Sequence, residues 1–156
     1  MFPEDALICF TDGCRGSSGT GSCIFGLRPN RSFSFPLGKF ATVFQTEIYD
    51  HLQGAFEKKR KACKNKRILI FSDSQAALKA LNSPKVTSGL VAECLDSLTL
   101  MAGMNEVTLI WVPGYSSIRG NEEVDKLARQ ASAMLLLGTE PALRMTKCSA
   151  REAIKN

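Results

Sequence analysis

The chain has 156 residues, of which 44% are hydrophobic and 22% charged, and this size predicts one domain with its own apolar core. Its net charge of +5 favours a polyanionic partner such as nucleic acid without requiring one. The amino terminus is acidic where a secretory signal would be basic, and no apolar run is long enough to cross a bilayer. These features exclude a membrane protein and predict a soluble intracellular one, nuclear or cytoplasmic.

The first half of the chain predicts a sheet. Residues 6–11 and 67–72, together with residues 107–112 further on, are short apolar segments closed by turn formers, which is typical of strands buried on both faces at a sheet centre. Between the first two, residues 21–27 and 32–37 flank Pro29 and Asn30, a turn signal that predicts an antiparallel meander. The sheet is therefore expected to be mixed.

Helical spacing of apolar residues predicts a long helix within residues 42–61 and another within 117–137, the latter capped by Asn121. Gly54 would weaken the first helix unless packing requires it. Two more helices are expected over residues 74–81 and 88–101. From residue 138 the periodicity is lost, so we expect a domain over 1–137 and a tail or linker over 138–156. The order of elements predicts one layered α/β domain with helices covering a mixed sheet.

The cysteines offer little chemistry. The six form no Cys-x-x-Cys pair, and His51, the single histidine, has no cysteine near it in sequence, which argues against a zinc site. Cys9 and Cys94 lie in apolar patterns and are expected to be reduced residues that pack as small hydrophobic side chains, rather than parts of a disulfide framework.

Acidic residues stand where two predicted strands end. Asp12 follows the first and Asp73 the fourth, and if these strands are parallel neighbours their carboxylates meet at one edge of the sheet, where open α/β folds place their sites. Each residue also has an ordinary structural interpretation. Asp12 would open an aspartate-glycine turn, and Asp73 would cap the following helix.

Two further acids lie on the long helices. Glu47 falls on or beside the apolar stripe of the first, where a charge is costly unless it is paired or bound to metal; the alternative is a glutamate that reaches solvent at the edge of the stripe. Asp125 lies in the first turn of the last helix, where acids favour the helix dipole in any case. Clustered carboxylates are tolerated when a hard divalent cation, Mg²⁺ or Mn²⁺, binds them. Two such ions would support phosphodiester cleavage, so the sequence favours a metal-dependent nuclease.

Four segments resemble the ribonuclease H domains, particularly those of non-LTR retrotransposon polyproteins: FTDGCRGSSGTGSCIFG, FATVFQTEIYDHLQGA, ILIFSDSQAALKAL and LIWVPGYSSIRGNEEVDKLARQA. The resemblance spans residues 6–133 and implies a five-stranded mixed sheet, three antiparallel strands then two parallel, with helices on both faces. It implies that Asp12, Glu47, Asp73 and Asp125 are catalytic and bind two Mg²⁺ or Mn²⁺ ions. The implied reaction is hydrolysis of the RNA strand of an RNA/DNA hybrid, leaving a 5′ phosphate, in retrotransposon reverse transcription. The reverse transcriptase portion of the same polyprotein is then a possible partner, and the isolated domain is expected to be a monomer.

The chain departs from the family's pattern at Tyr115, which stands where the family usually has histidine. A phenol does not exchange protons at neutral pH, so we expect a slower enzyme; His51 is expected to be an ordinary helix residue rather than a substitute. The basic helix that some members insert between the two middle helices is missing, so we expect weak, salt-dependent hybrid binding. Candidate substrate contacts are the residues beside the acids: Cys14, Arg15, Gly16, Gln45, Ser74 and Asn121.

Two other functions are alternatives to the nuclease. A non-enzymatic module with the same fold would bind nucleic acid or partner proteins after losing its chemistry; the four acids argue against it and Tyr115 argues for it. A transposase or integrase core is disfavoured because those proteins place their glutamate on a late helix, whereas Glu47 comes early.

Overall fold

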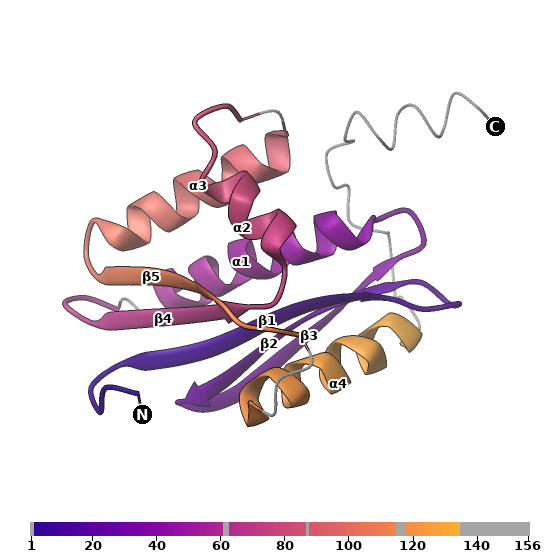
Figure 1. Cartoon of the computed structure of the whole chain (residues 1–156), viewed down its shortest axis with the longest axis horizontal. Helices are drawn as coiled ribbons and strands as arrows, with labels where there is room; N and C mark the ends of the chain where they lie inside the picture. The colour runs from indigo at the N-terminus through magenta and orange to yellow at the C-terminus, as the bar shows by residue number, and fades with distance from the viewer. Residues whose placement is uncertain (1, 61–62, 87, 115–117, 135–156) are drawn as a thin grey trace.

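The structure, a computed structural model, describes residues 2–60, 63–86, 88–114 and 118–134. A single sheet lies between helices (Figure 1). In chain order its elements are β1 (Leu7–Arg15), β2 (Thr20–Arg28), β3 (Asn30–Gly38), α1 (Val43–Arg60), β4 (Arg67–Ser72), α2 (Gln75–Leu81), α3 (Gly89–Ala102), β5 (Glu106–Trp111) and α4 (Arg119–Ala133). This is the predicted order, and most element ends fall within two residues of the expected ones. The expected tail over 138–156 lies outside the described residues.

The sheet is mixed, with the strand order β3-β2-β1-β4-β5. β1 pairs antiparallel with β2, and β2 pairs antiparallel with β3. On its other side β1 runs parallel to β4, which runs parallel to β5. The turn between β2 and β3 falls at Pro29, as its sequence indicates. The three antiparallel and two parallel strands confirm the expected architecture.

The position expected for β5 is wrong. Its composition predicted a strand buried on both faces at the sheet centre, but β5 is an edge strand whose residues are all exposed or half-buried. Trp111 is 45% exposed. An edge strand has a neighbour on one side only, so its side chains stay partly in solvent even when their composition matches that of a central strand.

Two apolar clusters fill the space on either side of the sheet. One joins Cys9 and Ile70 to residues of α1, α2 and α3. The other joins Ile8 and Phe10 to α4. Side chains alternate between the faces of a strand, so Ile8 and Phe10 point one way and Cys9 the other. In Figure 1, α1, α2 and α3 accordingly cover one face and α4 covers the opposite one.

Helix α1 begins with a reciprocal cap. The amide of Gln45 donates to Thr42 Oγ1 at 3.1 Å, and the amide of Thr42 donates to Gln45 Oε1 at 2.9 Å. This arrangement is a capping box, which satisfies two amides that the helix leaves without partners. It fixes the first turn of α1, and therefore the position of each later residue along the helix axis.

Helix α4 begins two residues before the expected cap. Its first residue is Arg119, and Asn121 lies inside the first turn. The Asn121 side chain donates to the carbonyl of Gly114 at 3.3 Å and therefore does not cap α4. The early start follows from packing, because Gly120 lies so close to the Phe10 ring that an added Cβ would be 2.1 Å from Cε2.

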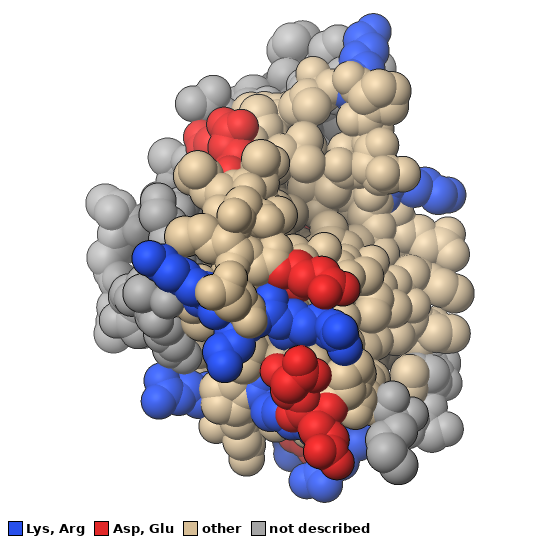
Figure 2. All heavy atoms as spheres, turned by 90° about the vertical axis from the view of Figure 1, so that its left-hand side faces the viewer, with Lys and Arg blue, Asp and Glu red and all other residues tan. Residues whose placement is uncertain are grey.

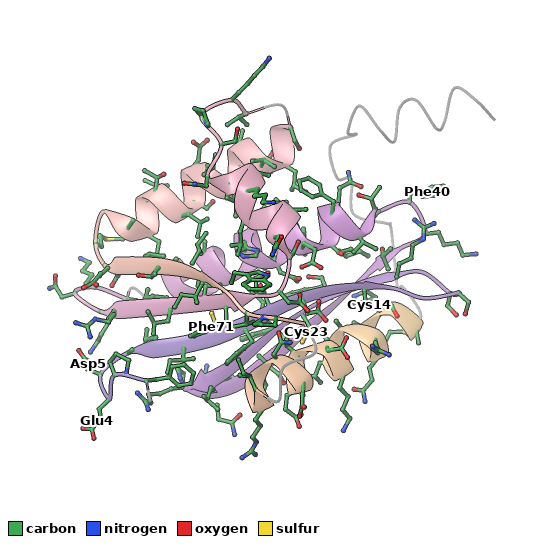
Figure 3. All side chains as sticks on the ribbon, in the orientation of Figure 1. Glu4, Asp5, Cys14, Cys23, Phe40 and Phe71 are labelled. Carbon is green, nitrogen blue, oxygen red and sulfur yellow. The ribbon has the colours of Figure 1, made fainter. Side chains whose placement is uncertain are left out.

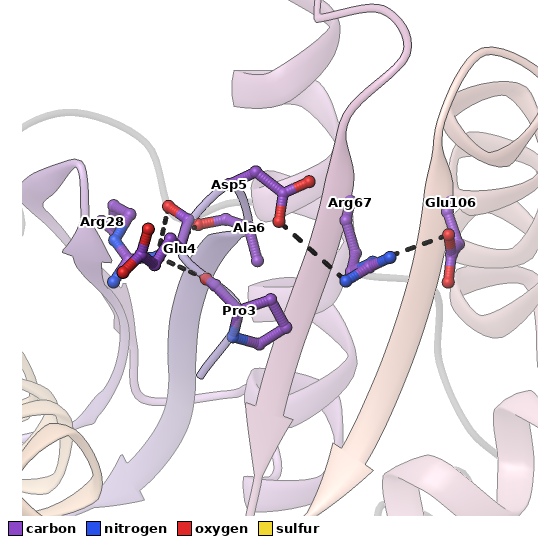
Figure 4. A network of polar contacts seen from close by, with 7 residues as sticks. All are labelled: Pro3, Glu4, Asp5, Ala6, Arg28, Arg67 and Glu106. Carbon is purple, nitrogen blue, oxygen red and sulfur yellow. Dashed lines mark hydrogen bonds and ion pairs between the residues drawn. The ribbon is translucent and has the colours of Figure 1, made fainter. Parts of the chain in front are cut away.

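The end of the sheet where β1, β4 and β5 begin is held by ion pairs. Arg67 lies between Asp5 and Glu106, and Arg28 donates to carbonyls of the amino-terminal segment (Figure 4). Figure 2 views the molecule from this side and shows acidic and basic side chains interspersed. These exposed pairs contribute little stability each. They fix the start of three strands whose other ends carry the acids.

Within the described ranges, no helix combines the length and the apolar character needed to cross a bilayer. Cys9 and Cys94 are buried in the apolar cluster beneath α1 and α3, as expected of cysteines that pack as small hydrophobic residues. Cys148 lies outside the described residues.

Packing does not require a glycine at position 54. An added Cβ would lie 3.8 Å from Ile24 Cδ1, an ordinary van der Waals contact. We therefore expect Gly54→Ala to raise the free energy of unfolding by about 1 kcal/mol, because alanine favours helix interiors over glycine. Urea unfolding measures the change. The matched control is Gly21→Ala, whose Cβ would lie 2.2 Å from the Ser132 amide of α4 and which we expect to destabilise. Equal effects from the two substitutions would contradict the packing described here.

Candidate metal centre and active site

Asp12 and Asp73 come together because β1 and β4 are parallel neighbours. Their pairing ends with Thr11 opposite Ser72, and the residues that follow these two are Asp12 and Asp73. Asp12 lies within β1, which continues to Arg15 along β2, so the interpretation of an aspartate-glycine turn is wrong. Asp73 is not a helix cap either, because Ser74 Oγ accepts from the Ala77 amide and caps α2.

Glu47 reaches the same place from α1 through the small size of Gly13. An added Cβ on Gly13 would lie 2.1 Å from Thr46 Oγ1 and 3.0 Å from the Glu47 amide. Only glycine permits this approach of the helix to β1. Glu47 is 6% exposed, so the interpretation of a glutamate reaching for solvent is wrong. Its Oε2 is buried without a hydrogen-bond partner among the described residues.

The three carboxylates converge. One oxygen from each of Asp12, Glu47 and Asp73 lies within 4.8 Å of the others. Three carboxylates, one of which has a buried and unpartnered oxygen, form a donor set suited to a hard divalent cation such as Mg²⁺ or Mn²⁺. In the part of the chain that the structure describes, no other group of three such ligands meets this condition.

The acids hold their protons strongly while no cation is bound. Burial, then the charges of Asp73 and Asp125, raises the pKa of Asp12 to about 8. Burial, then the charges of Asp12 and Asp73, raises the pKa of Glu47 to about 9. The pKa of Asp73 is raised as well, chiefly by burial. Strongly perturbed carboxyls with named charged neighbours are typical of functional sites.

Asp50, one turn after Glu47, is a buried acid that the sequence did not indicate. It is fully buried, and neither oxygen has a hydrogen-bond partner among the residues that the structure describes. Burial, then the charge of Glu47, holds its pKa well above the ordinary value, although the Cys23 amide faces it and favours the ionised form. A buried carboxyl in these surroundings favours its protonated form.

Asp125 stands beside this group rather than within it. Its charge contributes to the raised pKa of Asp12 and of Asp73, so it lies near both. Arg129, one turn later on α4, places its Nε 3.1 Å from each oxygen of the Asp125 carboxylate. The structure therefore brings together three of the four expected acids, with the fourth adjacent and paired with arginine.

The expected substrate contacts divide into two groups. Gln45, Ser74 and Asn121 have structural hydrogen bonds, in the cap of α1, in the cap of α2 and to Gly114 respectively. The second group lies on the β1–β2 hairpin, where Arg15 and Gly16 are exposed and Cys14 is half-buried. Tyr115 lies outside the described residues.

His51 is buried and forms part of the helix structure. Its Nδ1 donates to the carbonyl of Glu47 at 2.7 Å, one turn earlier on α1. Burial lowers the pKa of the imidazole, so the ring is neutral at pH 7. Its Nε2 is buried without a hydrogen-bond partner among the described residues. His51 is therefore buried rather than on the surface, and of its two ring nitrogens only Nδ1 has a hydrogen-bond partner among the described residues, so it is not an exposed proton carrier.

Two residues that contact Asp73, and one exposed residue on the loop before α1, were not singled out from the sequence. Trp111 Nε1 donates to the carbonyl of Asp73 at 3.2 Å, and Gly114 faces the Asp73 carboxylate. Phe40 is 87% exposed on the loop before α1, at the end of the molecule away from Glu4 and Asp5 (Figure 3). A tryptophan, proline and glycine after a strand indicate a loop, but not which strand end that loop approaches.

The raised pKa values make the stability of the metal-free protein depend on pH. From pH 5 to about pH 8 the folded state keeps protons that the unfolded chain has released, so we expect the free energy of unfolding to fall as pH rises, by about 1.4 kcal/mol per pH unit for each such proton. Urea unfolding in chelator measures this slope. Asp12→Asn should flatten it, and excess Mg²⁺ should stabilise most at high pH. A profile that rises with pH would contradict the shifts.

Comparisons with known proteins agree with this geometry. The family model for RNase H matches residues 4–133. A relative described as Ribonuclease H, from Syntrophus aciditrophicus (strain SB), is 25% identical over 158 aligned positions, which cover 89% of this chain and 87% of the relative. The match includes every described helix and strand. The chain therefore belongs to the ribonuclease H family, whose enzymes depend on divalent metal ions.

Proposed function

We propose that this chain hydrolyses the RNA strand of RNA/DNA hybrids with two divalent cations, leaving a 5′ phosphate on the product. The observation that carries the proposal is the convergence of Asp12, Glu47 and Asp73 from three separate elements. These residues would bind the cations, and Asp125 would complete the set from α4. Mg²⁺ or Mn²⁺ bound there would activate a water molecule and stabilise the leaving oxygen.

The protein's own contribution is to hold carboxyl oxygens together in a nearly dry site. Asp12 and Glu47 are almost fully buried, so few water molecules compete with a cation for their oxygens. Their raised pKa values mean that binding a cation displaces protons. Asp125 differs, because a cation that recruits it competes with Arg129 instead.

The exposed rim near the acids supplies candidate contacts to the hybrid. Arg15 is exposed, and its Nη1 lies 3.5 Å from the carbonyl of Ala41, which joins the β1–β2 hairpin to the loop before α1. Phe40, next to Ala41 on that loop, presents an exposed ring. A cationic group and an apolar surface together suit phosphate and sugar, and the backbone of Cys14 and Gly16 lies on the same hairpin.

The biological setting follows from the motifs alone. Their resemblance to non-LTR retrotransposon domains supports a role in reverse transcription inside the cell, with the reverse transcriptase portion of the same polyprotein as partner and residues 1–137 as the nuclease domain. In this proposal the isolated domain is a monomer and binds hybrid weakly. The expected salt dependence reflects phosphate contacts.

Cleavage of a labelled RNA/DNA hybrid tests the activity directly. With Mg²⁺ or Mn²⁺ we expect cutting of the RNA strand, and with chelator none, because in this proposal the acids act on the phosphodiester only through a bound cation. Asp73→Asn should lower kcat by at least about a hundredfold, since it removes one metal ligand. Gel analysis of the products measures the rate and identifies the 5′ phosphate.

Two controls separate the alternatives. RNA and DNA duplexes should stay intact; if both are cut like the hybrid, the selectivity is wrong while the metal chemistry survives. If neither metal supports cutting and Asp73→Asn matches the parent, the chain is instead a non-enzymatic module that binds nucleic acid or a partner. Tyr115 is the observation that favours this second function.

Restoring the usual histidine tests the effect of Tyr115. We expect Tyr115→His to raise kcat at neutral pH by about tenfold, because an imidazole exchanges protons where a phenol does not. Tyr115→Phe should change kcat little and serves as the matched control. Equal rates for the parent and both variants would show that this position does not limit turnover.

A further inference from the structure

Three hydrogen bonds fix the backbone around Asp73. The carbonyl of Ser72 accepts from the Val112 amide at 3.0 Å, and Ser72 Oγ accepts from the Ser74 amide at 3.2 Å. The carbonyl of Asp73 itself accepts from Trp111 Nε1 at 3.2 Å. With its peptide groups held on both sides, Asp73 keeps only the rotation of its side chain to decide where the carboxylate lies.

Gly114 limits that rotation. A Cβ added to Gly114 would lie 3.0 Å from Asp73 Oδ2 and 3.8 Å from its Cβ and Cγ. The carboxylate therefore lies against the α-carbon of Gly114, in space that a side chain there would contest. The backbone of Gly114 is not in the left-handed region, so the need for glycine comes from this contact and not from conformation.

Gly114 is in turn tied to α4. Its carbonyl accepts from Asn121 Nδ2 at 3.3 Å, and Asn121 is 2% exposed. The neighbouring Gly120 lies against the Phe10 ring, which anchors this first turn of α4 on β1. The turn that holds Gly114 is therefore packed on the strand that carries Asp12.

We propose that Gly114 and Asn121 are positioning residues for the Asp73 carboxylate, acting from the β5–α4 connection on a ligand carried by β4. The inference rests on the proposed function, in which Asp73 binds a cation. Asn121 holds Gly114, and Gly114 restricts the Asp73 side chain before a cation arrives. Because Asp125 lies one turn after Asn121 on the same helix, this connection also sets α4 relative to β4. Substitution of a group that orients a metal ligand commonly lowers metal affinity by about 10- to 100-fold.

A merely structural role for this connection predicts a different result. If Gly114 and Asn121 only stabilise the loop, substitutions would lower the melting temperature without altering metal affinity in the folded protein. If they position Asp73, metal affinity and kcat change together, while KM for the hybrid stays nearly constant because Asn121 Nδ2 is used within the protein and the proposed nucleic-acid contacts lie on the β1–β2 hairpin.

Gly114→Ala tests the contact at an exposed position where the backbone accepts alanine. Calorimetric titration with Mn²⁺ should show a dissociation constant raised by about tenfold, with kcat lowered, KM unchanged and the melting temperature in chelator unchanged. The matched control is Gly103→Ala, the same change at an exposed turn distant from the acids, where the added Cβ would meet its nearest atom at 3.4 Å. Parental Mn²⁺ affinity in Gly114→Ala would overturn the proposal.

Asn121→Ala and the double variant test the connection to α4. We expect Asn121→Ala to weaken Mn²⁺ binding, and the double variant to lose less affinity than the sum of the single losses, because both act through Gly114. Fully additive losses would overturn the assignment of Asn121. If Asn121→Ala does not fold, Gly114→Ala alone decides whether the proposal stands.

Asp73→Asn separates this inference from the proposed function. If Asp73→Asn binds Mn²⁺ as the parent does, Asp73 is not a ligand and the proposed function fails. If Asp73→Asn loses binding while Gly114→Ala matches the parent, the proposed function stands and only the positioning role is overturned.

Discussion

The site depends on one close approach, that of α1 to β1 at Gly13. Any side chain at this position would meet Thr46, the residue before Glu47. Thr46 donates its hydroxyl to the Val43 carbonyl at 2.6 Å, so the oxygen that lies against Gly13 already has a hydrogen-bond partner within α1. With the helix at this distance, Glu47 reaches Asp12; a helix displaced by one methyl group would hold the two carboxylates apart. This approach brings two carboxylates close together. Their mutual repulsion is costly, and their oxygens can bind a cation.

Glycines act in the same way on the opposite face, where α4 packs on β1 and β2. Added side chains at Gly21 and Gly120 would meet the α4 backbone and the Phe10 ring respectively. The helices α1 and α4 thus lie close to the same stretch of β1 from opposite faces. α1 brings Glu47 toward Asp12, and α4 brings Asp125. The sheet supplies Asp12 and Asp73 between them, so like charges arrive from three directions at one place. The fold tolerates this without a cation by leaving the buried acids protonated.

The sequence predicted the parts of this arrangement that depend on pattern. Apolar segments placed the strands, helical spacing placed α1 and α4, and acids at element ends indicated where chemistry is expected. Neighbour relations were harder. β5 has the composition of a central strand and lies at the edge, and Asn121 looks like a cap but bonds Gly114. Acids near the predicted strand ends are a local signal, so Asp12 and Asp73 could be picked out from the sequence. Their meeting was conditional on β1 and β4 being parallel neighbours, which the structure confirms and no local pattern shows. Asp50 and the contact of Gly114 with Asp73 depend on distances across the fold, and no local pattern carries them.

The fourth acid shows that the chain uses two ways of accommodating like charges. Asp12 and Glu47 are buried, and without a cation they are neutral because they retain protons. Asp125 is partly exposed and pairs with Arg129, whose pKa its carboxylate raises further. A cation that gathers all four acids must therefore displace protons from the buried pair and a guanidinium from the exposed one. The first exchange becomes easier as pH rises, whereas the second does not respond to pH near neutrality because arginine stays charged. Cation binding to Asp12 and Glu47 thus depends on pH, whereas recruitment of Asp125 from α4 depends on competition with Arg129. Both processes bring a cation to the same cluster of oxygens.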